Sequence, residues 1–200
     1  MEPPAAGWSA LHHGLDPAAV PLLRPWLSLI WRLARPLAAL RVPPTALTAV
    51  GVVLAADAVL FAARLPWIAL ALVLLSALCD GLDGAVAMLS RRVSAFGSVA
   101  DKTADRIADC AFAAVLWRCG APWPLALAAG ALSLAHEGIR LVLGGRRLAR
   151  ITVAERPTRV ICAALACACA GVSPATWPPA VCAGVWAGLA VIGLAQLVVR

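Results

Sequence analysis

The chain has 200 residues, of which 62% are hydrophobic and only 14% are charged, and its mean hydropathy is +0.89. Soluble domains carry about 45–50% apolar and about 25% charged residues, so this composition excludes an ordinary soluble domain, and it also excludes intrinsic disorder. A net charge of +7 in so apolar a chain indicates basic loops beside a membrane and not a nucleic-acid-binding protein. The expected fold class is an all-α integral membrane protein.

The first 42 residues are expected to form a tail and one amphipathic helix. Residues 17–41 place four arginines among leucines and tryptophans, which is too many charges for a membrane span. The pattern is typical of a helix that lies in the membrane interface, with Trp26 and Trp31 at the depth of the lipid headgroups.

Six apolar segments follow in residues 43–200, which we take as one domain. With the N-terminus inside, fifteen of the 17 Lys and Arg residues fall on the cytoplasmic side, and only Arg64 and Arg118 fall outside. This bias follows the positive-inside rule, so both termini of a multi-pass protein of the plasma membrane should be cytoplasmic. The expected spans are 44–63, 67–89, 96–117, 122–143, 158–172 and 180–199.

Acidic residues are concentrated in these spans, where a carboxylate costs about 2.5–3.5 kcal/mol at the bilayer centre and is a functional candidate by default. Seven of the ten acidic residues lie there: Asp57, Asp80, Asp83, Asp101, Asp105, Asp109 and Glu137.

Four of these carboxylates are expected to converge near the cytoplasmic face. Asp80 and Asp83 are three residues apart near the end of the second span, and Asp101 and Asp105 are four apart near the start of the third. Each pair shares a helical face, and a tight turn joins the two spans. Carboxylates packed together repel unless a cation lies among them, and an all-oxygen set favours Mg²⁺, Mn²⁺ or Ca²⁺ over zinc.

Gly81 and Gly84 flank the first pair and would leave a bare backbone face for a phosphate or nucleotide. The simpler interpretation of the aspartates is a set of ion pairs between helices with Lys102, Arg106 and Arg140. This interpretation is stronger for Asp109, which needs only to pair with an arginine.

The remaining polar residues in the spans have structural explanations. A structural hydrogen bond is expected for Asp57, which stands alone in the first span. A hydrogen bond in the core is favoured over a catalytic role for His136, and Glu137 is placed to orient Arg140.

Residues 80–105 resemble the signature of the CDP-alcohol phosphatidyltransferases, D-x-x-D-G-x-x-A-R, eight residues, G-x-x-x-D-x-x-x-D. Seven of the eight fixed positions match over these 26 residues. The segment from Pro44 to Thr48 is also similar to the P-N-x-x-T that opens the family's first span. One position departs, because Met88 stands where the family has arginine, and this puts the activity level or the usual substrate in doubt. The matching residues are Asp80, Asp83, Gly84, Ala87, Gly97, Asp101 and Asp105.

The resemblance implies a role for each matching residue. Asp80, Asp83, Asp101 and Asp105 would be ligands of a pair of Mg²⁺ or Mn²⁺ ions, with Asp105 also the general base. Asp80, Gly84, Ala87 and Gly97 would form the cytidine nucleotide site. The implied reaction transfers a phosphatidyl group from CDP-diacylglycerol to an alcohol and releases CMP, and family likeness also implies a homodimer in the lipid bilayer.

The connection between the fourth and fifth spans is the most basic part of the chain and suggests the acceptor. Arg140, Arg156 and Arg159 could hold a phosphate through forked hydrogen bonds, which favours a phosphorylated polyol such as glycerol 3-phosphate or inositol phosphate. The alternative for this basic connection is attraction to anionic lipid headgroups.

Two other function classes stay open. Met88 supports a catalytically weak or silent paralogue that acts as a membrane interaction protein. Intramembrane carboxylates are also found in cation transporters, although no internal repeat is visible here.

Overall fold

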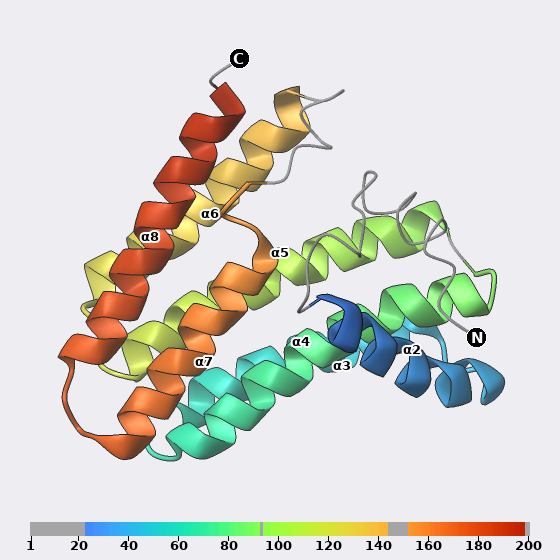
Figure 1. Ribbon diagram of the computed structural model, residues 1–200, viewed down its shortest axis with the longest axis horizontal. Helices are drawn as coiled ribbons and strands as arrows, with labels where there is room; N and C mark the ends of the chain where they lie inside the picture. Colours follow the sequence, from blue (N-terminus) through green and yellow to red (C-terminus); the bar gives the residue numbers. More distant parts are fainter. Residues whose placement is uncertain (1–22, 93, 144–151, 199–200) are drawn as a thin grey trace.

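The computed structural model describes residues 23–92, 94–143 and 152–198, and in these ranges the chain is helical with no strand. Figure 1 shows the helices α2 to α8 packed as one bundle, with α6 beside α8 and α2 lying along α4. The all-α fold class is confirmed. The helices are α2 (Leu23–Ala39), α3 (Pro44–Phe61), α4 (Pro66–Leu89), α5 (Ala95–Arg118), α6 (Trp123–Leu143), α7 (Arg156–Val172) and α8 (Trp177–Val198).

Helices occur where the apolar segments were predicted, and local signals set their ends. A proline lies in the first two positions of α3, α4 and α7, where its missing N–H costs no helical hydrogen bond. Ser94 caps α5 by accepting a hydrogen bond from the Gly97 N–H. Connections of four residues join α3 to α4, α5 to α6 and α7 to α8, so these pairs form tight hairpins at the same end of the bundle.

Within the described residues, four helices are long and apolar enough to cross a membrane, namely α3, α4, α6 and α8. Helix α5 does not qualify because of its many charges, and α7 has only 17 residues. The predicted count of six spans therefore stays a proposal. The described part of the predicted amphipathic segment is the helix α2, and residues 17–22 lie outside the described residues.

Small residues allow the helices to pack closely in the core. Alanines such as Ala58, Ala129 and Ala166 are fully buried beside the larger Phe112 and Leu116. In the same interior the Trp186 Nε1–H donates a hydrogen bond of 2.7 Å to the Ser133 hydroxyl. The outer surface is rich in exposed Leu, Val and Trp, as expected of a bundle surrounded by lipid.

Helix α2 covers α4 and corrects the expectation for Gly81. A Cβ on Gly81 would lie 2.8 Å from Cδ1 of Ile30, so this glycine serves the close approach of α2 and does not open a face to a nucleotide. Sequence reasoning missed this contact because it gave α2 no partner. Met88 also faces α2, where it packs against Leu27 and Trp31.

Candidate active site

Three aspartates meet where the end of α4 lies beside the start of α5. Asp80, Asp101 and Asp105 each offer one oxygen, and these three oxygens lie within 4.8 Å of one another. Three of the four carboxylates that were expected to converge therefore do so. Such an all-carboxylate group suits a hard divalent cation.

Asp83 lies beside this group but is held by a different helix. It is 5% exposed, and its Oδ2 accepts a hydrogen bond of 2.6 Å from the Thr48 hydroxyl of α3. Sequence reasoning quoted Thr48 only as part of a motif and gave it no role, although the side chain orients one of the four predicted ligands. A small pocket against these carboxylates is lined by Thr48, Gly51, Val52, Ser76, Asp80, Asp83, Ala104, Asp105, Ala108 and Arg156.

Arg156, the first residue of α7, points into this pocket. Its Nη1 lies 3.1 Å from Oδ1 of Asp80, and the same atom is ion-paired with Asp105. The side chain is about a fifth exposed. A cation from α7 therefore faces carboxylates of both α4 and α5, and the site is assembled from all three helices.

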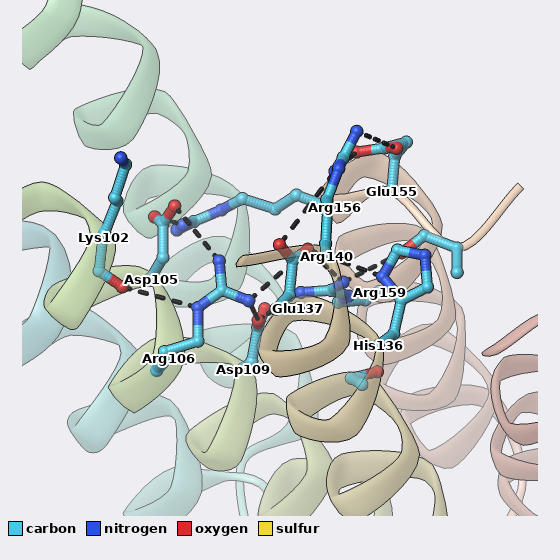
Figure 2. Close-up of polar contacts among 12 residues, drawn as sticks. Lys102, Asp105, Arg106, Asp109, His136, Glu137, Arg140, Glu155, Arg156 and Arg159 are labelled. Carbon is cyan, nitrogen blue, oxygen red and sulfur yellow. Dashed lines mark hydrogen bonds and ion pairs between the residues drawn. The ribbon is translucent and has the colours of Figure 1, made fainter. Parts of the chain in front are cut away.

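A second charged cluster lies next to this site, between α5, α6 and α7 (Figure 2). Arg159 is ion-paired with Asp109 and lies 2.8 Å from Oε1 of Glu137. Arg106 lies 3.4 Å from Asp109, 3.5 Å from Glu137 and 3.7 Å from Asp105, so it links the second cluster to the first. The expected pairing of Asp109 with an arginine is confirmed.

Polar contacts also secure the segment that leads into α7. The Arg140 guanidinium lies 3.1 Å from Glu155 and 4.0 Å from Glu137. His136 is fully buried, and its Nε2 lies 3.0 Å from the Thr152 hydroxyl, which confirms the expected hydrogen bond. Thr152 and Glu155 were not predicted to contribute, although their T-x-x-E spacing before α7 is typical of the contact in which the Thr152 N–H donates a hydrogen bond of 3.1 Å to Oε1 of Glu155. Their contacts with His136 and Arg140 join distant parts of the chain, and no spacing indicates them.

The predicted nucleotide residues lie at the same end of α4 and α5, and their role stays a prediction. Gly84 is exposed, and a Cβ placed on it would meet nothing within 4 Å. Ala87 is partly buried one turn later, and Gly97 lies in the first turn of α5. The hydrogen bond expected for Asp57 is not confirmed, because no described residue is bonded to its side chain.

Comparison with known proteins identifies the family of the chain. The sequence model of one family, described as CDP-alcohol phosphatidyltransferase, matches residues 41–197. The chain belongs to the CDP-alcohol phosphatidyltransferase family. Members are transferases of substituted phosphate groups that use divalent metals, and the three converging carboxylates fit such an ion.

A curated relative of this transferase is the archaetidylinositol phosphate synthase of Aeropyrum pernix. The two sequences are 46% identical over 55 residues, and this match covers 28% of the chain and 28% of the relative. The likeness therefore reaches only about a quarter of either protein.

Proposed function

We propose that this family member transfers a phosphatidyl group from CDP-diacylglycerol to an alcohol acceptor and releases CMP. The observation that carries the proposal is the convergence of Asp80, Asp101 and Asp105 from two helices on one point, with Asp83 beside them. Four nearby carboxylates and an arginine at a small pocket suit the recognition of a diphosphate through cations.

The chemistry we propose follows from what each group can do. The acceptor oxygen forms a bond to the lipid-bearing phosphorus, and the phosphoanhydride bond to CMP breaks. Asp105 takes the proton of the attacking hydroxyl as general base. Asp80, Asp83, Asp101 and Asp105 would hold two Mg²⁺ or Mn²⁺ ions, and such ions would supply positive charge for the diphosphate and the departing CMP. Gly84, Ala87 and Gly97 would adjoin the cytidine nucleotide.

The acceptor we favour is a phosphorylated polyol, either inositol phosphate or glycerol 3-phosphate. Arg156 supports this choice, because it is partly exposed and lies directly beside the carboxylates where a second anionic substrate would meet the diphosphate. The name of the Aeropyrum pernix relative also points to an inositol phosphate product. Arg140 and Arg159 were expected to share this role with Arg156.

We also propose the arrangement in the membrane. Helices α3 to α8 form six spans, α2 lies at the interface, and both termini and the site lie at the cytoplasmic face of the plasma membrane. The positive-inside charge bias supports this orientation. The lipid tails of the donor would stay in the bilayer, the polar acceptor would arrive from the cytoplasm, and two copies would form a homodimer.

A silent paralogue is the second candidate, and one observation favours it. Met88 replaces the motif arginine, and its side chain belongs to the apolar contact between α2 and α4. Position 88 therefore supplies no positive charge to the phosphates of a bound nucleotide. A cation transporter is less well supported, because the carboxylates gather at one end of the bundle and do not follow a path through it.

Release of CMP by the purified protein in detergent tests the proposal. The protein is supplied with CDP-diacylglycerol and Mg²⁺ and screened against glycerol 3-phosphate, inositol phosphate, inositol and serine. We expect release that depends on the metal and on one acceptor. Asp105→Asn should abolish release without loss of folding, whereas Asp57→Asn, a matched change on α3 away from the site, should retain it.

Two other outcomes would contradict parts of the proposal. Normal turnover by Asp105→Asn would remove Asp105 as the base. Binding of CDP-diacylglycerol without release, whichever acceptor is added, would support the silent paralogue, and Met88→Arg would then test whether the missing cation is the cause.

A further inference from the structure

One arginine of the basic connection is enclosed by protein. Arg159 is 1% exposed, although it lies only three residues after the partly exposed Arg156. Its Nη1 is bound by Asp109 of α5, and its Nη2 donates hydrogen bonds of 2.8 Å to Glu137 of α6 and 2.9 Å to the carbonyl oxygen of Ala154. Figure 2 shows this guanidinium between the two helices.

These contacts use both terminal nitrogens of Arg159, and its Nε–H, which has no partner among the described residues, is buried and out of reach of a substrate. An arginine binds a phosphate by offering two parallel N–H groups, and both terminal nitrogens of Arg159 are already used by protein acceptors. Arg156 differs because its Nη1 faces the pocket and the carboxylates of Asp80 and Asp105. Two arginines of identical chemistry therefore have different surroundings.

We propose that Arg159 is a positioning residue, which fixes the start of α7 so that Arg156 faces the carboxylates, and that it does not touch the acceptor. This inference rests on the proposed function. Arg159 ties together α5, α6 and the carbonyl of Ala154, which lies two residues before Arg156. Positions 156 and 159 are one turn apart on a helix, so fixing one side chain sets the position of the other.

The energetics of buried ion pairs give this proposal a distinctive test. Removing one partner leaves the other charge buried without compensation, whereas replacing both partners with apolar groups of similar volume is often neutral. If Arg159 positions α7, a second substitution at Asp109 should correct the damage caused by the first. If Arg159 binds the acceptor, the second substitution cannot help. In the double variant, Arg106 still pairs with Glu137 and Asp105.

The test compares Arg159→Met, Asp109→Leu and the double variant, with Arg118→Met as a control on an exposed arginine at the far end of α5. We measure KM for the acceptor and for CDP-diacylglycerol. Each single variant should raise the acceptor KM by up to about 10²-fold, as expected for a displacement of about 1 Å, and leave the donor KM unchanged. The acceptor KM of the double variant should be at least about tenfold lower than that of Arg159→Met. Arg118→Met should have the same KM values as the wild type.

Hydrogen exchange of the backbone amides of residues 152–160 supplies a measurement that needs no turnover. Exchange should be faster in Arg159→Met and should slow again in the double variant. Unchanged exchange, or a double variant whose acceptor KM is no better than that of Arg159→Met, would overturn the proposal. If the wild type transfers to no acceptor, the proposed function fails, but the exchange measurement still decides whether Arg159 positions α7.

Discussion

One added methyl group at Gly193 on α8 should disturb the active site without touching it. A Cβ at this position would lie 2.5 Å from the Cβ of Ala154 and 3.3 Å from the ring of His136. Ordinary contacts of this kind begin at about 3.4 Å, so Ala154 has to move by about 0.9 Å. Ala154 is 3% exposed, and a Cβ cannot rotate away as the end of a long side chain can.

This displacement has two measurable consequences in Gly193→Ala. Overpacking costs about 1–3 kcal/mol, and alanine in a helix returns about 0.5–1 kcal/mol, so the free energy of unfolding should fall by up to about 2.5 kcal/mol. Because Arg156 follows Ala154 by two residues, a shift of this size should also reduce turnover, by up to about 10²-fold.

The assay measures thermal unfolding in detergent and CMP release for Gly193→Ala beside Gly188→Ala. Gly188 lies on the same helix, and a Cβ there meets nothing within 4 Å, so this control should be as active as the wild type and equally or slightly more stable. If Gly193→Ala unfolds at the same temperature as Gly188→Ala and turns over equally fast, the packing of Ala154 against α8 does not hold the start of α7.

Three further predictions test the contact of α2, the core and the metal. Gly81→Leu should push Ile30 aside and loosen α2, seen as faster proteolysis within α2, and wild-type cleavage rates would contradict the close contact. Ser133→Ala should leave the buried Trp186 N–H without its acceptor and lower the free energy of unfolding by about 1–3 kcal/mol in thermal melts, whereas the exposed Ser98→Ala should not. Chelation with EDTA should stop CMP release and added Mg²⁺ should restore it; release that persists in EDTA would show that the carboxylates act without a divalent ion.

The helices and the family could be predicted from the sequence because both depend on local patterns. Apolar runs ended by proline or by charged turns place α3 to α8 within a few residues of their observed bounds. The convergence of Asp80 with Asp101 and Asp105 also followed from spacing, because a short turn forces the end of one helix beside the start of the next.

Contacts between distant helices could not be predicted, because no spacing encodes them. Gly81 and Gly84 are alike in sequence, yet the packing of α2 covers the first and leaves the second open. Arg156 and Arg159 are likewise one turn apart, and only the positions of Asp109 and Glu137 determine which is enclosed. Thr48 acquires its contact with Asp83 only when α3 packs against α4.

The charges of α5 also constrain how the protein is made. Five charged residues fall within positions 101–109, and each would cost about 2.5–3.5 kcal/mol at the bilayer centre, so α5, as one of the six proposed spans, would be costly to insert alone. In the proposed arrangement, the four-residue connection to the apolar α6 would allow the two helices to enter as a hairpin. Of the two arginines that pair with Asp109, Arg106 lies on the same helix, whereas Arg159 follows fifty residues later in the chain. The ion pairs that enclose Asp109 are therefore complete only once α7 has joined α5, so the last helices of the chain finish a site whose carboxylates lie in its middle.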